Sequence, residues 1–269
     1  MSIVMKNSQE KKQSNLVKPG TIWQLGEHRL ALGDCRDKQL VARLLNGEQV
    51  TSVNVDVPYG VEYNLSKKGF SKVSKTKDIA NDEIISDEAY TKFTYEWLTA
   101  VLPHLAKKNS IYIFNSDKML FALKDGMDQA GVKFSQLLIW IKNHAVVGRK
   151  DYLPQHELVA YGWFGAHQFR KAKDKSVLLY PKPNNSPLHP TMKPVGLIRH
   201  LILNSSKIGN IVFDGFLGSG TTLLACEQTG RRCMGIELDP EYCLTAIRRW
   251  EKYTRLTAVE ICEGKEHHD

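Results

Sequence analysis

Short apolar runs alternate with amphipathic stretches along most of the chain. Continuous or alternating apolar runs are typical of buried strands, and they cover residues 50–55, 110–115, 134–140, 155–163, 211–214 and 233–236. Apolar residues spaced three or four apart indicate helices over residues 87–106, 118–131, 195–205 and 241–253. This alternation predicts an α/β fold, a mostly parallel sheet with helices on both faces and ligands at the carboxyl ends of the strands.

The two ends of the chain carry weaker patterns. Residues 1–18 are polar and are expected to form a disordered tail, and the last residues are typical of a frayed end. Residues 23–25 and 29–32 flank Gly26 and predict a small hairpin. In the helix over 241–253, Arg248 and Arg249 are expected to face solvent. A single domain over residues 19–269 accounts for these patterns.

A glycine-rich loop between two of the expected elements is the first candidate for chemistry. The strand that begins at Ile211 ends in Asp214, and Gly-Ser-Gly-Thr-Thr at 218–222 opens a short helix. The next strand ends in Glu237, an acid at a position that suits a ribose diol. An ordinary strand–turn–helix junction also needs glycines, and the loop matches neither a phosphate-binding P-loop nor the Gly-x-Gly-x-x-Gly pattern.

Three further motifs stand at the ends of predicted elements. Asp56-Val57-Pro58-Tyr59 follows a strand, and His-Pro-Thr-x-Lys-Pro at 189–194 precedes a helix. Gly-Asp-Cys at 33–35 precedes another helix, where Asp34 could simply be the N-cap. Each motif alone is also compatible with a plain turn.

Taken together and in this order, the motifs resemble those of β-class DNA amino-methyltransferases, which use S-adenosylmethionine and carry an Asp-Pro-Pro-Tyr motif. The resemblance runs from about residue 23 to residue 253, and the catalytic motif precedes the cofactor loop, which marks the circularly permuted β-type order. It implies a class I, Rossmann-like methyltransferase fold. It also implies methyl transfer to the exocyclic N6 amine of adenine in DNA, because serine rather than aspartate is more typical of cytosine-N4 enzymes at the first motif position.

The resemblance assigns a role to each motif residue. Asp56 and the Val57 carbonyl would accept the two hydrogens of the amine, with Pro58 between them and Tyr59, which would stack on the base. This draws the amine toward tetrahedral geometry and aims its lone pair at the sulfonium methyl. The implied cofactor-binding residues are Asp34, Cys35, Asp56, Thr191, Lys193, Asp214, Phe216, Gly218, Ser219, Gly220, Thr221, Thr222 and Glu237.

Two departures from the family pattern keep further functions open. Val57 and Gly215 stand where the family usually has proline. Valine keeps the backbone carbonyl on which the mechanism depends, but a catalytically silenced DNA-binding protein of the same fold remains an alternative. Cytosine-N4 methylation also stays open, as does a nicotinamide dehydrogenase if the glycine loop and Glu237 are considered alone.

The charge balance favours a polyanionic partner. The net charge is +8 with a pI of about 9.1, and basic residues gather in three stretches. Residues 164–187 are the candidate target-recognition insertion, although a basic surface loop would look the same. The candidate DNA contacts are Lys67, Lys68, Arg149, Lys150, Arg170, Lys171 and Lys173. His156 is assigned a structural or base-pocket-lining role. Double-stranded DNA is the expected partner, and the resemblance also allows a homodimer and a cognate restriction endonuclease.

Cysteine usage and hydropathy bear on compartment and metals. The five cysteines are scattered without a Cys-x-x-Cys pair, and the histidines lack zinc spacing. No metal is expected, because a neutral thioether leaves the reaction without help. The chain begins with a polar stretch rather than a signal peptide and has no apolar run of membrane-spanning length. A cytoplasmic, nucleoid-associated protein with no membrane contact is the corresponding expectation.

Overall fold

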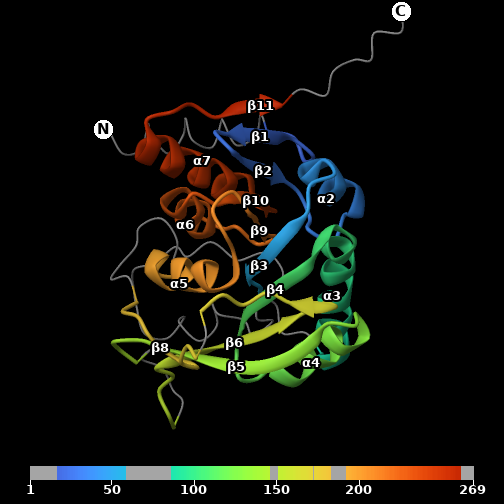
Figure 1. The fold of residues 1–269 in the computed structure, drawn as a ribbon, viewed down its shortest axis with the longest axis vertical. Helices are drawn as coiled ribbons and strands as arrows, with labels where there is room; N and C mark the ends of the chain where they lie inside the picture. The colour runs from blue at the N-terminus through green and yellow to red at the C-terminus, as the bar shows by residue number, and fades with distance from the viewer. Residues whose placement is uncertain (1–16, 59–85, 146–150, 172, 183–191, 262–269) are drawn as a thin grey trace, which may run out of the picture.

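The computed structural model describes residues 17–58, 86–145, 151–171, 173–182 and 192–261. Within these residues the strands form one eleven-stranded sheet in the order β11-β1-β2-β10-β9-β3-β4-β6-β5-β8, with β7 paired to β4 (Figure 1). The strands are β1 (Ile22–Leu25), β2 (His28–Leu32), β3 (Val50–Asp56), β4 (Leu105–Asn115), β5 (Lys133–Ile141), β6 (His156–Trp163), β7 (Ala166–His167), β8 (Val177–Leu179), β9 (Ile211–Asp214), β10 (Arg232–Glu237) and β11 (Val259–Ile261).

The centre of the sheet is parallel. β2, β10, β9, β3 and β4 are neighbours in this order and all run the same way, whereas β1, β6 and β5 join by antiparallel pairing. The expected mostly parallel sheet is confirmed. Because β3 precedes β9 by about 150 residues yet lies next to it, two motifs distant in sequence end at the same edge of the sheet.

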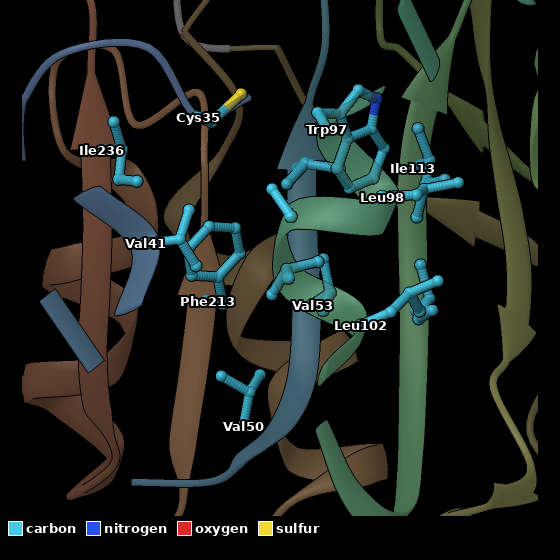
Figure 2. Packing of buried hydrophobic residues seen from close by; sticks show 14 of the residues in the cluster. Cys35, Val41, Val50, Val53, Trp97, Leu98, Leu102, Ile113, Phe213 and Ile236 are labelled. Carbon is cyan, nitrogen blue, oxygen red and sulfur yellow. The ribbon is translucent and has the colours of Figure 1, made fainter. Parts of the chain in front are cut away.

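Helices cover both faces of the sheet, as the alternation of side chains along the strands requires. Ile111 and Ile113 of β4 and Phe213 of β9 point into one core, whereas Tyr112 and Val212 point into the other. Figure 2 shows part of the first core, in which Phe213 and Val53 lie opposite helical side chains. The helices on this face are α2 (Lys38–Leu45), α3 (Asp87–Val101) and α4 (Leu120–Gln129), and those on the other face are α5 (Val195–Ser205), α6 (Thr221–Thr229) and α7 (Pro240–Thr254).

Three boundaries differ from the sequence prediction. The helix expected over 87–106 ends at Val101, because Pro103 lacks an N–H and a single 3-10 turn, η2 (Leu102–His104), leads straight into β4. The N-cap of α2 is Asp37, whose side chain accepts from the amides of Gln39 and Leu40, and not Asp34. Part of the expected frayed C-terminal end is ordered, because β11 pairs antiparallel with β1.

The segment expected to be a target-recognition insertion contributes to the sheet itself. β7 pairs with β4, and β8 is the edge strand beside β5. Between them, Asp174 accepts hydrogen bonds from His200 and Asn204 of α5. These bonds tie the described part of residues 164–187 to the helix that follows the Lys193 motif.

Candidate active site

Three acidic side chains end three neighbouring parallel strands. Asp56 ends β3, Asp214 ends β9 and Glu237 ends β10, and β9 lies between the other two. The carboxyl ends of parallel strands meet at one edge, so the fold gathers all three acids there. Asp56 and Glu237 both raise the pKa of Asp214 through their charge, which reflects this proximity.

The loop after β9 is held by two of these acids. Oδ1 of Asp214 accepts the amide of Phe216 over 3.0 Å, and Oε2 of Glu237 accepts the amide of Gly218 over 2.6 Å. The other carboxylate oxygen of Glu237 accepts the amide of Asp239 over 2.8 Å. Glu237 therefore joins the glycine-rich loop to the start of α7.

The helix that follows the loop begins without a side-chain cap. Gly220 is the N-cap of α6, with a left-handed φ of 85° that glycine adopts without a Cβ penalty, and no side chain accepts from the first turn. Thr221 and Thr222, the first two helical residues, are buried. Within the described residues, the first-turn amides of α6 keep the capacity to bind a polar or anionic group.

Burial changes the titration of the two loop-holding acids. Desolvation raises the pKa of Asp214 to about 7, against the opposing hydrogen bonds from Thr222 and from the amide of Phe216. Desolvation likewise raises the pKa of Glu237 to about 7. Both groups therefore change charge near neutral pH, and a ligand that supplies donors or positive charge would favour their ionised forms.

Gly215 is required by a close approach of another predicted motif. A Cβ at this position would lie 2.9 Å from the Cβ of Cys35, a side chain that is itself buried. The structure thus gives a packing reason for glycine where the family pattern has proline. Asp34, one residue earlier, pairs instead with Arg36, with 2.6 Å between Oδ2 and Nη2.

Phe216 anchors the loop to the opposite helix layer. Its ring lies edge-on to Trp97 of α3 at a centroid separation of 5.8 Å, and at the same separation from the ring of Phe93. Its expected role was cofactor binding; its described contacts are with the helix core. The adjacent loop residues are consequently fixed on α3 as well as on Glu237.

Arg249 is a contact that the sequence pattern missed. The prediction placed both arginines of α7 in solvent, and Arg248 is exposed. Arg249 is half-buried and donates to the hydroxyl of Ser219 over 2.9 Å and to the carbonyl of the same residue. Helical periodicity could have separated the two, because Ala246 and Trp250, the neighbours of Arg249 on its face, are buried.

A chain of four charged side chains leads away from Asp56. Nζ of Lys193 lies 2.6 Å from Oδ2 of Asp56 and 2.9 Å from Oε2 of Glu157, and Nζ of Lys142 lies 2.7 Å from Oε1 of Glu157. Both lysine side chains are only 5% exposed. Lys142 and Glu157 were not predicted; the sequence signal was a charged residue at each adjoining end of two apolar strands.

The electrostatics of this chain of charges favour ionised groups. Burial alone would lower the pKa of Lys193, but the carboxylates of Asp56 and Glu157 raise it above its ordinary value. Burial alone would raise the pKa of Glu157, but Lys193 and Lys142 lower it. His156, expected to be structural or to line a base pocket, is exposed, and its neighbour Glu157 is the residue that turns inward.

The remaining predicted residues fall into two groups. Val57 is buried within the core and Pro58 is half-buried, directly after Asp56. Arg170, Lys171 and Lys173 are exposed. Six predicted residues lie outside the described residues: Tyr59, Lys67, Lys68, Arg149, Lys150 and Thr191.

Neither a metal centre nor a membrane segment emerges from the described part of the chain. No group of three or more histidine, cysteine, aspartate or glutamate side chains there is placed to hold a metal ion. No helix among the same residues is long and apolar enough to cross a membrane. The chemistry of the site accordingly has to be sought in the acids, the lysine and the glycine loop.

Two curated proteins show the kind of sequence to which the chain is similar. It is 27% identical over 194 residues to the type II methyltransferase M.HpaI of Haemophilus parainfluenzae, a match that covers 62% of this chain and 62% of that protein. It is 25% identical over 224 residues to the type II methyltransferase M2.DpnII of Streptococcus pneumoniae, covering 76% and 83%.

Solved structures share the fold. The PvuII DNA methyltransferase, described as cytosine-N4-specific, matches with a TM-score of 0.66 and 17% identity over 88% of this chain and 93% of its own. The M1.HpyAVI–SAM complex matches with a TM-score of 0.60 and 23% identity over 82% and 98%. A DNA modification methylase from Thermus thermophilus, TTHA0409, in complex with S-adenosyl-L-methionine, matches with a TM-score of 0.62 and 19% identity over 89% and 100%.

The family profile spans the catalytic motif, the buried charges and the glycine-rich loop. This profile of N6/N4 methyltransferases, described as DNA methylase, matches residues 50–248. The matched region runs from the first residue of β3 into α7 and includes Asp56, Lys193 and Glu237. Since the match covers well over half of the chain, the protein belongs to the N6/N4 DNA methylase family.

Proposed function

We propose that this protein transfers a methyl group from S-adenosylmethionine to the exocyclic N6 amine of adenine in DNA. The observation that carries the proposal is the adjacency of β3 and β9, which pair in parallel with Val53 beside Phe213. Asp56 and the loop after Asp214 therefore start from the same edge of the sheet. Family membership and the two type II methyltransferases among the relatives support the same reaction class.

The residues at this edge suit the proposed cofactor. Each carboxylate oxygen of Glu237 accepts one backbone amide and keeps lone pairs that could accept a ribose hydroxyl. Asp56, Asp214 and Glu237 together offer negative charge to a cationic ligand. When bound, S-adenosylmethionine would supply an electrophilic methyl group on its sulfonium. Two of the similar structures are described as complexes with that molecule.

Asp56 is the proposed acceptor for the substrate amine. The lone pair of an exocyclic amine is delocalised into the base, so the amine is a poor nucleophile until acceptors draw its hydrogens out of the plane. The carboxylate of Asp56 and the carbonyl of Val57 would do this, and preorganised acceptors of this kind lower the barrier without reorganisation. Valine supplies the same carbonyl as proline, and its buried side chain keeps the segment in place.

Adenine is preferred over cytosine because the motif begins with aspartate. The similarity to the cytosine-N4-specific PvuII enzyme does not oppose this choice, since 17% identity speaks only for the fold. Either base would have to leave the duplex to reach Asp56, at a cost of a few kcal/mol. Exposed Arg170, Lys171 and Lys173 are proposed to contact the DNA backbone.

Asp56→Asn tests the proposal, because it keeps the shape of the side chain and removes its charge. We expect methyl transfer from labelled S-adenosylmethionine to DNA to fall by about 100-fold or more, with the cofactor Kd within about threefold of wild type. Asp37→Asn is the matched control, since asparagine caps a helix as well as aspartate. Full activity of Asp56→Asn would contradict the assignment, and equal loss of cofactor binding would place Asp56 in the cofactor site instead.

A further inference from the structure

The ammonium of Lys193 is shared between two carboxylates. Its Nζ lies 2.6 Å from Asp56 and 2.9 Å from Glu157, from strands β3 and β6 respectively. The other oxygen of Glu157 binds Nζ of Lys142. Two acids and two lysines thus alternate in one buried chain, and one end of it is the proposed amine acceptor.

Aromatic rings limit the access of water to this chain. Nζ of Lys193 lies 5.3 Å from the ring centroid of Phe114 and 6.0 Å from that of Trp140. Nζ of Lys142 lies 5.4 Å from the ring of Trp140. The indole nitrogen of Trp140 donates to the carbonyl of Tyr180 over 2.8 Å, which fixes the ring. Charges beside these rings are screened weakly, so each strongly affects the next.

Stability alone gives a poor reason for four buried charges. Removing such groups from water costs about as much as their attraction returns, and apolar residues of similar volume often stabilise a fold equally well. The arrangement does have an electrostatic consequence at Asp56. A carboxylate that is fully paired with an ammonium is a weaker hydrogen-bond acceptor for another donor, and Glu157 draws part of that ammonium away.

We propose that Glu157, anchored by Lys142, is a positioning residue that divides the charge of Lys193 and so sets how strongly Asp56 accepts the substrate amine. The inference rests on the proposed function for the role of Asp56, but the division of charge stands on the distances alone. Lys142 acts through Glu157 and not directly on Asp56. Asp214, which interacts electrostatically with Asp56 from β9, is the other nearby carboxyl group that affects it.

The direct test is the titration of Asp56 in the full-length protein. Carbon-13 NMR of protein labelled at aspartate carboxyls reports its pKa, with Asp56→Asn for assignment. Glu157→Gln should lower this pKa by about one unit, because Lys193 then pairs with Asp56 alone. Lys142→Met should raise it, because Glu157 then draws Lys193 more strongly. In the Glu157→Gln background, Lys142→Met should have little effect. Lys142→Arg, which keeps the charge, should restore the wild-type value.

Methylation kinetics give the second readout. The acid limb of kcat/KM should move in the same direction as the pKa of Asp56 in each variant, and kcat should fall by about tenfold in Glu157→Gln with little change in KM. Additive effects of Glu157→Gln and Lys142→Met on the pKa would overturn the inference. An unchanged pKa in both single variants would overturn it as well. A wild-type protein that shows these pKa shifts but no methyl transfer would refute the proposed function and leave the division of charge intact.

Discussion

The amide of Gly218 donates to Oε2 of Glu237 over 2.6 Å, so one buried carboxylate holds the loop that follows the neighbouring strand. Glu237 is buried, and its pKa is raised to about 7 by desolvation. The same group is thus structural in the free protein and is proposed to accept the ribose of the cofactor. Its charge state connects the two roles.

Cofactor affinity should therefore depend on pH. Hydroxyl donors and a positive ligand favour the carboxylate forms of Glu237 and Asp214, so binding lowers both pKa values and releases protons below about pH 7. Affinity for S-adenosylmethionine should rise as pH increases from about 5.5 to 7.5 and level off above, because both acids are then already ionised. Calorimetry in buffers of different ionisation enthalpy measures the proton release. Glu237→Gln should lose much of the dependence, and a flat profile for the wild type would contradict this linkage.

Arg249 should contribute to cofactor binding although it was expected in solvent. Arg249→Gln removes the bonds to Ser219 that hold the start of α6, and should raise the cofactor Kd on the order of tenfold. Arg248→Gln, a change to the exposed neighbouring side chain on the same helix, is the matched control and should leave the Kd near wild type. Equal effects of the two substitutions would point to general charge rather than to the Ser219 contact.

Gly215 and Cys35 should be energetically coupled. A methyl group at 215 would meet the Cβ of Cys35 at 2.9 Å, so Gly215→Ala should destabilise the fold by about 1–3 kcal/mol. Cys35→Gly removes the opposing atom, and the double variant should lose less stability than the sum of the single changes. Urea denaturation measures all four proteins. Gly196→Ala in α5, where the new methyl meets only ordinary contacts, is the control. Additive losses would show that the two sites do not touch.

Basic residues before β8 should contact DNA. Lys171→Gln with Lys173→Gln should weaken DNA binding and reduce the slope of log K against log salt by about 0.9 for each lost phosphate contact. Lys171 also pairs with Asp174 at 3.6 Å, so Lys173 should account for the larger share. Lys92→Gln with Lys124→Gln, on α3 and α4 away from β8 (Figure 1), is the matched control. An unchanged slope in the first variant would exclude this surface.

The fold follows from the sequence because its information is local. Alternation along β4 and β9 assigns side chains to two cores, and that pattern requires helices on both faces. The motif acids could be placed for the same reason, since each ends an apolar run whose strand is parallel to the next. Asp37 rather than Asp34 caps α2 because the chain makes a further turn after Gly33, and two aspartates three positions apart fit the pattern equally well.

The partners of Asp56 could not be predicted in this way. Lys142 and Glu157 come together because β5 and β6 pair antiparallel, with Trp140 opposite Glu157. Lys193 reaches them from a segment 36 residues further along. Pattern along the chain does not show such a contact, since it depends on how three elements pack. Arg249 was missed because two adjacent arginines read alike until the buried face of α7 is known.

The most direct test of the central claim is the identity of the methylated base. Purified protein is incubated with S-adenosylmethionine and unmethylated DNA, the DNA is digested to nucleosides, and the products are separated by mass spectrometry, with Asp56→Asn as the blank. We expect 6-methyladenine that is absent from the blank. Detection of 4-methylcytosine would retain the reaction and overturn the base assignment. Absence of any methylated base, from protein shown separately to bind the cofactor, would contradict the proposed activity.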